Sequence, residues 1–234
     1  MAVRRFPSRE EERYMCGRYQ TMTPDELKNL YEVVRETERN LYDLQDEIRT
    51  HPTAYPGEME GIYPSNRGII YPTDRAVVVQ DTGGDLLLRQ MRWGFPGYVD
   101  KKNPGAKPRP LINTRSETAA SLVTWKDALK NRRCAVPAKE YYEWDKGRPK
   151  KGYAFSLPES TWFFMAGLYT EIRKLDGSKE LRFSVLTTSA NSSVADVHDR
   201  MPVVILPGEL MQWLSGDYSS LFDRSHILFE RSMI

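Results

Sequence analysis

The sequence predicts one α+β domain built mainly from antiparallel strands. Its 234 residues are long for one ordinary domain and short for two, and no linker or internal repeat divides them. Hydrophobic residues make up 40% and charged residues 28%, values typical of a globular chain with a packed core. Hairpin-sized spacings between the apolar segments outnumber the longer spacings of βαβ units, which favours antiparallel pairing.

The first predicted element is an amphipathic helix. Thr23 can cap it, Pro24 suits the first helical position, and Glu26 completes a capping box. Apolar residues then recur at helical spacing as far as Ile48. A stretch rich in Pro and Gly follows from Pro52 to Pro72.

Strands and one further helix make up the rest. Residues 76–80 and 86–91 are strand-like, and the turn residues Thr82-Gly83-Gly84 between them indicate a hairpin. Residues 94–110 are predicted to form a long loop, and residues 116–133 are helical in character. Four more strands are predicted, at Cys134–Pro137, Trp162–Tyr169, Leu181–Thr188 and Pro202–Leu206.

Composition excludes several classes of protein. The longest apolar run has eight residues, far below the ~20 that a membrane span requires, and the first twenty residues lack the apolar segment of a signal peptide. Only Cys16 and Cys134 are present, too few for a disulfide scaffold or a thiolate zinc site. No His, Cys and carboxylate cluster has ligand spacing. We therefore expect a cytoplasmic protein with no membrane partner, no metal and no cofactor. A monomer is expected as well, although composition does not determine the oligomeric state.

Charge is unevenly distributed along the chain. Residues 89–151 carry a net charge of +10, whereas residues 25–60 carry −6. One positive face of this kind attracts polyanions such as nucleic acid. Solvated lysines in surface loops explain the same count, so charge alone leaves both interpretations open.

Cys16 stands in an unusual position, directly after Met15. If translation starts at Met15, removal of that methionine makes Cys16 the first residue, with a free amine beside its thiol. The amine then has a pKa of about 7.7 to 8.0 and the thiol one of about 8.5, so both nucleophiles are available near neutral pH. The alternative is a small buried apolar side chain, which is the commoner role of a lone cysteine. Cys134, at the head of a predicted strand, is interpreted as structural.

Three other segments carry polar residues suited to chemistry. Asn113 and Arg115 could hold a phosphate or sugar oxygen, or simply form a capped helix entry with a surface arginine. Glu143, between Tyr142 and Trp144, is either partly desolvated and able to exchange protons, or a solvated carboxylate on an edge strand. His198 is suited to proton transfer, or is a loop histidine bonded to a neighbouring carboxylate.

Five motifs in order resemble the SRAP (SOS response-associated peptidase) family, from Met15 to about Trp213. They are Met15-Cys16-Gly17-Arg18-Tyr19, Arg92-Trp93-Gly94, Asn113-Thr114-Arg115-Ser116-Glu117, Arg133-Cys134-Ala135-Val136-Pro137 with Tyr142-Glu143-Trp144, and His198-Asp199-Arg200-Met201-Pro202. The resemblance implies a compact α+β domain with antiparallel strands in a barrel-like core and helices outside.

The resemblance also implies covalent capture of abasic sites in single-stranded DNA. Cys16 would close a thiazolidine with the aldehyde of the opened sugar, and Glu143, His198 and Asn113 would be the other catalytic residues. Arg18, Arg115 and Arg200 would contact phosphates, and Trp93 would stack on a base. Pro64 would match a family loop beside the lesion.

The chain departs from the family pattern in its first fourteen residues. We expect residues 1–14 to be an extension absent from the mature protein and residues 15–234 to be the domain. A wrongly assigned start, removal of the leader by the protein itself, and DNA binding without covalent capture remain three explanations. The corresponding alternatives are an autoproteolytic cysteine peptidase and a non-covalent single-strand binding module. Whether a strand-cleaving lyase step follows is left open by the sequence.

Overall fold

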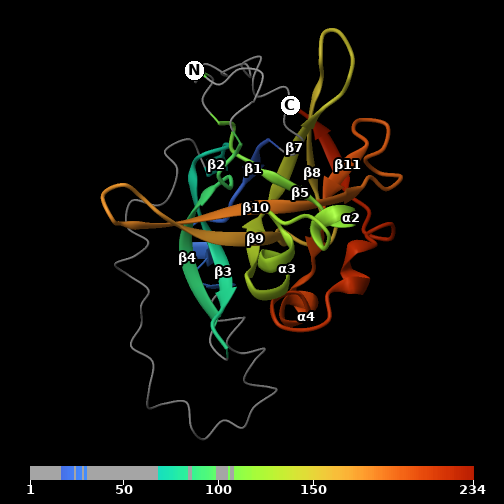
Figure 1. Cartoon of the computed structure of the whole chain (residues 1–234). Helices are drawn as coiled ribbons and strands as arrows, with labels where there is room; N and C mark the ends of the chain where they lie inside the picture. The colour runs from blue at the N-terminus through green and yellow to red at the C-terminus, as the bar shows by residue number, and fades with distance from the viewer. Residues whose placement is uncertain are drawn as a thin grey trace, which may run out of the picture.

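The fold centres on a closed barrel of five strands (Figure 1). The computed structural model describes residues 17–23, 25–27, 29–30, 68–83, 86–98, 105 and 108–234. The barrel strands are β3 (Arg75–Asp81), β4 (Leu86–Trp93), β10 (Lys179–Ser189), β9 (Phe163–Arg173) and β6 (Arg133–Ala138). Each pairs with the next in this order, and β6 returns to β3. Closure leaves these five strands no free edge along their shared length.

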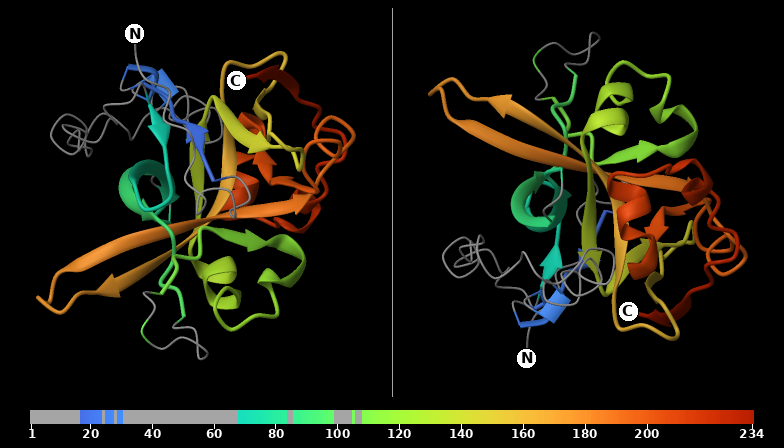
Figure 2. Two further views of the ribbon diagram at one scale, coloured as in Figure 1. Left: turned by 90° about the horizontal axis from the view of Figure 1, so that it is seen from above. Right: turned by 90° about the horizontal axis from the view of Figure 1, so that it is seen from below.

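Most of the strand pairs are antiparallel, as the sequence predicts, but β10 makes two parallel pairings. It pairs with β4 at Arg182–Arg92 and then, further along, with β5 (Asn113–Arg115). Its other neighbours are antiparallel: β9, and β11 (Arg200–Pro202) at its end. β10 therefore runs through the whole domain and touches the segments carrying Asn113 and Arg200. The far end of the β9–β10 hairpin projects from the body of the domain (Figure 2).

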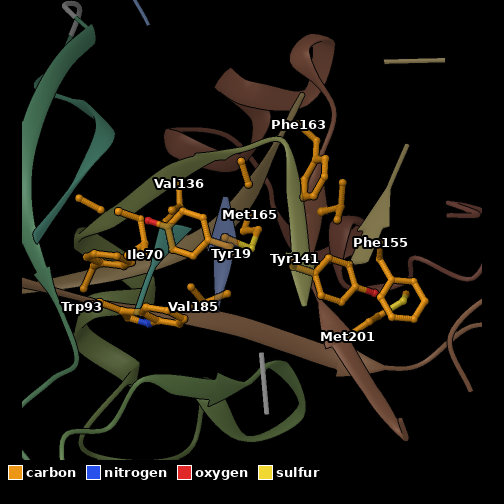
Figure 3. Packing of buried hydrophobic residues seen from close by; sticks show 14 of the residues in the cluster. Tyr19, Ile70, Trp93, Val136, Tyr141, Phe155, Phe163, Met165, Val185 and Met201 are labelled. Atoms are coloured by element: carbon orange, nitrogen blue, oxygen red, sulfur yellow. The ribbon is translucent and has the colours of Figure 1, made fainter. Parts of the chain in front are cut away.

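A second, antiparallel sheet of five strands lies against the barrel. Its order is β13 (Glu230–Met233), β8 (Gly152–Ser156), β7 (Glu140–Trp144), β1 (Tyr19–Gln20) and β2 (Ile69–Ile70). Tyr19, Tyr141 and Phe155 from its inner face join the barrel residues Trp93 and Val136 in one buried cluster (Figure 3). The two sheets thus share a core, which makes the described chain a single domain.

Helices cover the outer face of the barrel. The buried residues form two core clusters, one shared by the barrel and the second sheet and one on the outer face of the barrel. Successive residues of β3 alternate between them: Val78 belongs to the shared cluster, and Val77 and Val79 belong to the outer one. This outer cluster includes Leu129 of α3 (Lys126–Asn131) and Trp213 of α4 (Leu210–Leu214). None of the helices in the described part of the chain is long and apolar enough to cross a membrane.

Several sequence predictions can be compared with the structure directly. The capping box is confirmed, because the Thr23 N–H donates to Glu26 Oε2 at 2.7 Å and the Glu26 N–H donates to Thr23 Oγ1 at 3.2 Å. The predicted strands at 76–80, 86–91, 134–137 and 181–188 lie within β3, β4, β6 and β10. The strand predicted at 162–169 corresponds to β9, which begins one residue later than predicted. Residues 31–48 and Pro64 lie outside the described residues.

Two predicted elements differ from the structure. The helix predicted at 116–133 is two short helices, α2 (Ser116–Ala119) and α3, separated by a turn in which the N–H groups of Ser121 and Leu122 both donate to Thr118 O. Arg133 already belongs to β6. The strand predicted at 202–206 is split into β11 and β12 (Val204–Ile205), since between them Val203 bonds to both β10 and β9.

Glu180 is a buried carboxylate on the outer side of the barrel, surrounded by four cations. Arg92 Nε lies 3.0 Å and Lys174 Nζ 3.6 Å from Oε1, Arg182 Nε donates to Oε2 at 2.8 Å, and Arg75 lies 3.8 Å away. Burial raises the pKa of Glu180, but the hydrogen bonds from Arg92 and Arg182 outweigh it and lower the pKa to about 2. The carboxylate is therefore ionised throughout the neutral range.

Replacing Glu180 with glutamine is expected to lower the free energy of unfolding at pH 7 by about 2 kcal/mol, because charged hydrogen bonds are lost. Since folding depresses this pKa, the stabilisation is present above the ordinary glutamate value of about 4.5 and is lost as the pH falls toward 2. Urea unfolding at pH 7 and near pH 2.5 checks this, and the difference from wild type should shrink at the lower pH. Glu171→Gln, which breaks an exposed pair with Lys179, is the control and should cost less than about 1 kcal/mol. A loss that is equal at both pH values would contradict the ion-pair account.

Candidate functional site

The candidate residues lie on four segments that converge on one core cluster. Four candidate residues each have a chain neighbour buried in the cluster shared by the barrel and the second sheet. These neighbours are Tyr19 beside Arg18, Ile112 beside Asn113, Val197 beside His198 and Met201 beside Arg200. Tyr141, two residues before Glu143, belongs to the same cluster (Figure 3). The fold therefore brings together segments that are far apart in the sequence. Cys16 itself lies outside the described residues.

Glu143 lies on β7, an interior strand of the second sheet. β1 pairs with β7 through Tyr19–Tyr141, and the Tyr142 N–H donates to Arg18 O at 3.0 Å, so the pairing runs on toward Gly17 and Glu143. Glu143 is only 3% exposed. The solvated edge-strand interpretation is therefore wrong and the desolvated one is confirmed.

Asn113 and Arg115 lie on β5, beside the far half of β10. Asn113 pairs with Val185 and is partly buried, whereas Arg115 pairs with Thr187 and is exposed. Arg115 also precedes α2, but its side chain makes no capping hydrogen bond. Its guanidinium is therefore free of a capping role and faces solvent, where an anion can reach it.

Arg200 is held by protein acceptors rather than left open to solvent. Its side chain is 10% exposed, and its two terminal nitrogens lie 2.5 and 2.8 Å from the carboxylate oxygens of Glu117. One of them also donates to Thr187 O at 2.6 Å. The hydrogen bond from Arg200 lowers the pKa of Glu117. A phosphate would have to displace Glu117 to reach Arg200, and the phosphate contact stays a prediction.

His198 is fixed by the backbone that follows it. The Arg200 N–H donates to Nδ1 at 3.0 Å, while Arg200 O and Asp199 Oδ1 lie 3.2 and 3.3 Å from the same atom. In the tautomer protonated at Nε2, Nδ1 accepts the bond from the Arg200 N–H. A ring protonated at Nδ1 finds acceptors in the other two oxygens. His198 thus has a partner in either protonation state.

Trp93 is a core residue, which corrects the expectation that it stacks on a base. It is 1% exposed. Its ring lies edge-on to that of Tyr19, with the ring centroids 5.3 Å apart, and stacks on that of Phe183 at a centroid distance of 6.1 Å. Its Nε1–H donates to Ile112 O at 2.9 Å. The indole has apolar neighbours and a satisfied donor, and no face is left for a nucleobase.

Cys134 is structural, as expected. It is fully buried on β6, and burial raises the pKa of its thiol, which keeps it protonated and unreactive. Among the described residues, no three His, Cys, Asp or Glu side chains are grouped closely enough to hold a metal ion.

Comparisons with known proteins identify the family of the chain. Residues 15–231 match the family model described as SOS response associated peptidase (SRAP). The chain belongs to the SRAP family. Among its SRAP relatives, the Bacillus subtilis abasic site processing protein YoqW is 30% identical over 67% of this chain and 69% of its own. The Escherichia coli abasic site processing protein YedK is 31% identical over 54% of each chain, and Gallus gallus HMCES, likewise named, is 28% identical over 58% of this chain and 48% of its own.

Solved structures share the SRAP chain's fold. A crystal structure of a Bordetella bronchiseptica protein aligns over 94% of this chain and 99% of its own with a TM-score of 0.67 at 20% identity. A Bacteroides thetaiotaomicron protein aligns over 71% of this chain and 77% of its own with a TM-score of 0.59 at 22% identity. Both show the architecture of the domain.

Three residues around the SRAP site were missed as functional candidates. Glu117 pairs with Arg200, and Tyr71 and Trp144 lie against the guanidinium of Arg18. The alternation of β7 could have indicated Trp144, since Tyr142 and Trp144 share one face while Glu143 points to the other. Nothing in the sequence pairs Glu117 with a residue 83 positions away.

Proposed function

We propose that this SRAP protein processes abasic sites in single-stranded DNA by joining itself covalently to them through Cys16. Its relatives in three organisms carry the name of abasic site processing protein. The observation that carries the proposal is the burial of Glu143 beside the chain leading to Cys16, on the same core that holds the segments of Asn113 and His198.

The chemistry requires Cys16 to be the first residue. Its free α-amine would add to the aldehyde carbon of the opened deoxyribose and lose water, giving a Schiff base. The thiol sulfur would then add to the same carbon while its proton passes to the nitrogen, which closes a five-membered thiazolidine. The sum is one aldehyde plus one aminothiol giving one ring and one water. An internal cysteine cannot react in this way, because its nitrogen is an amide whose lone pair is delocalised.

The other residues have separate roles in this proposal. Glu143 moves protons to and from the amine and the Schiff base nitrogen. His198, as the protonated imidazolium, gives one proton to the ring oxygen as the sugar opens and becomes neutral imidazole. Asn113 orients the lesion, and Arg18 and Arg115 contact phosphates. Arg200 contributes once an incoming phosphate displaces Glu117.

The extension at residues 1–14 is absent from the mature protein in this proposal, together with Met15. A start at Met15 followed by methionine removal yields Cys16 at the amino terminus. Self-removal of the leader is a second route, which the word peptidase in the family's description favours. Incubation of the full chain and of its Cys16→Ala variant separates the two routes. Self-cleavage predicts that the full chain yields a product beginning at Cys16 and that the Cys16→Ala variant is not cleaved.

The decisive experiment compares two forms of the protein on a single strand carrying an abasic site. The form beginning at Cys16 should give a species whose intact mass equals protein plus DNA minus one water. The uncleaved full chain and the Cys16→Ala variant should give none, whereas Cys134→Ala, the matched cysteine control, should still react. Adduct formation by Cys16→Ala, or by a full chain that keeps its leader, would refute the mechanism.

A further inference from the structure

Arg18 is held between two aromatic rings contributed by the strands on either side of it. Its guanidinium carbon lies 4.6 Å from the centroid of Tyr71 and 4.8 Å from that of Trp144. In the second sheet β1 lies between β2 and β7, and Tyr19 pairs with both Ile70 and Tyr141. This register places Tyr71 directly opposite Arg18 and Trp144 diagonally opposite it. A ring as large as that of Trp144 can span the diagonal distance to Arg18. The clamp is therefore a product of the sheet register.

The clamp orients the guanidinium without neutralising its charge. Other arginines with fixed geometry in the described chain pair with carboxylates, as Arg200, Arg224 and Arg231 do with Glu117, Glu209 and Asp196. None of the ion pairs among the described residues involves Arg18, and its Nε is buried with no hydrogen-bond partner there. Aromatic faces attract a cation but offer no hydrogen-bond acceptor comparable to a carboxylate. Within the described residues, no carboxylate therefore neutralises the positive charge of Arg18.

Trp144 is itself held in place. A Cβ added at Gly152, which pairs with Trp144, would lie 2.8 Å from the indole Nε1 and 2.9 Å from Ile234 Cγ1. Because Gly152 has no side chain, the Trp144 indole and Ile234 can pack in the space that a Cβ would occupy. A ring held in this way cannot swing freely away from Arg18.

We propose that Tyr71 and Trp144 are positioning residues that preset Arg18 to bind a DNA phosphate two residues from Cys16. This inference rests on the proposed function, in which Arg18 contacts a phosphate. An arginine that is already ordered loses less rotamer freedom on binding than a mobile one, which increases affinity. The rings act through Arg18 and need not touch the DNA.

The test measures non-covalent binding, so that it does not depend on Cys16 chemistry. The probe is a fluorescent single strand of about 12 nucleotides carrying a tetrahydrofuran abasic analogue, which has no aldehyde, titrated between about 50 and 200 mM salt. Arg18→Met and Trp144→Leu should each weaken binding about three- to tenfold. Each should also reduce the slope of log K against log salt by about 0.7, the loss of one phosphate contact. The double variant should bind no more weakly than Arg18→Met alone.

Conservative variants and a remote control complete the design. Trp144→Phe and Tyr71→Phe keep a ring on each side and should restore both affinity and slope. Tyr218→Leu removes a ring that lies at the same 4.6 Å distance from Arg133, far along the chain beside α4, and should change neither. If Trp144→Leu fails to fold by thermal melting, Tyr71→Leu tests the clamp from its other side.

Three results would overturn the proposal. An unchanged salt slope with weaker binding in Trp144→Leu would mean that the indole stacks on a base. Additive losses in the double variant would mean that Trp144 does not act through Arg18. Wild-type binding by Arg18→Met would remove the phosphate contact itself. Covalent capture of an aldehyde-bearing strand, measured separately on the same proteins, shows whether the proposed function stands in each case.

Discussion

Replacing Glu143 with glutamine is expected to slow covalent capture of an abasic site about 100-fold or more while leaving the protein folded. Glutamine has nearly the same shape as glutamate but cannot exchange a proton, and proton transfer by a positioned side chain contributes about 10²–10⁴-fold to a rate. Glu143 is 3% exposed, so solvent has little access to replace it. The measurement is the rate of adduct formation by the form beginning at Cys16, followed on denaturing gels or by intact mass.

Glu140→Gln is the matched control for this prediction. Glu140 lies on the same strand three residues earlier, on the other face of the sheet, where it accepts a hydrogen bond from the Tyr142 hydroxyl. Its loss should change the capture rate less than about twofold. Equal losses in the two variants, or a wild-type rate in Glu143→Gln, would remove Glu143 from the proton-transfer role. An unchanged thermal midpoint in both variants would confirm that the comparison is one of chemistry.

Replacing Trp93 with alanine is expected to cost about 3–5 kcal/mol of folding free energy, a large part of the roughly 5–15 kcal/mol that stabilises a typical domain. The substitution leaves a cavity between Tyr19 and Phe183 and removes the donor to Ile112 O. Urea unfolding at neutral pH measures the effect. Because Ile112 leads directly into β5, the loss of this hydrogen bond should also displace Asn113.

Trp93→Phe separates the core role from a DNA-binding one. It should cost less stability than alanine, since most of the ring volume stays, and should leave affinity for single-stranded DNA unchanged because the indole is 1% exposed. Loss of DNA affinity at wild-type stability would show that the ring reaches a base, contrary to its burial in the structure.

The sequence predicted the barrel better than the second sheet, for a physical reason. β3, β6 and the first half of β9 are mainly apolar runs buried on both faces, and such runs stand out in a sequence. β1 and β2 have two residues each, and β13 is exposed along its whole length. Segments this short carry too little periodicity to predict, and only pairing with neighbours makes them strands.

The candidate site divides in the same way. Motifs in order along the chain predict one shared site, and chain neighbours of four of its residues lie in one core cluster, whereas Cys16 lies outside the described residues. The motifs do not predict burial: they place Trp93 at the DNA, although the barrel encloses it. Nor did they predict pairing: the bond between Arg200 and Glu117, and the rings around Arg18, depend on a strand register that no local pattern encodes.

The register between β1 and β7 sets an order of events during synthesis on the ribosome. Tyr19 emerges more than 120 residues before its partner Tyr141, a delay of about 6 to 24 seconds at typical elongation rates. Until then β1 has at most one of its two neighbouring strands, β2, since Ile70 emerges before Tyr141, and enzymes that trim nascent chains can reach the segment that follows Cys16. Any maturation of the amino terminus can therefore be complete before the barrel closes around its partners.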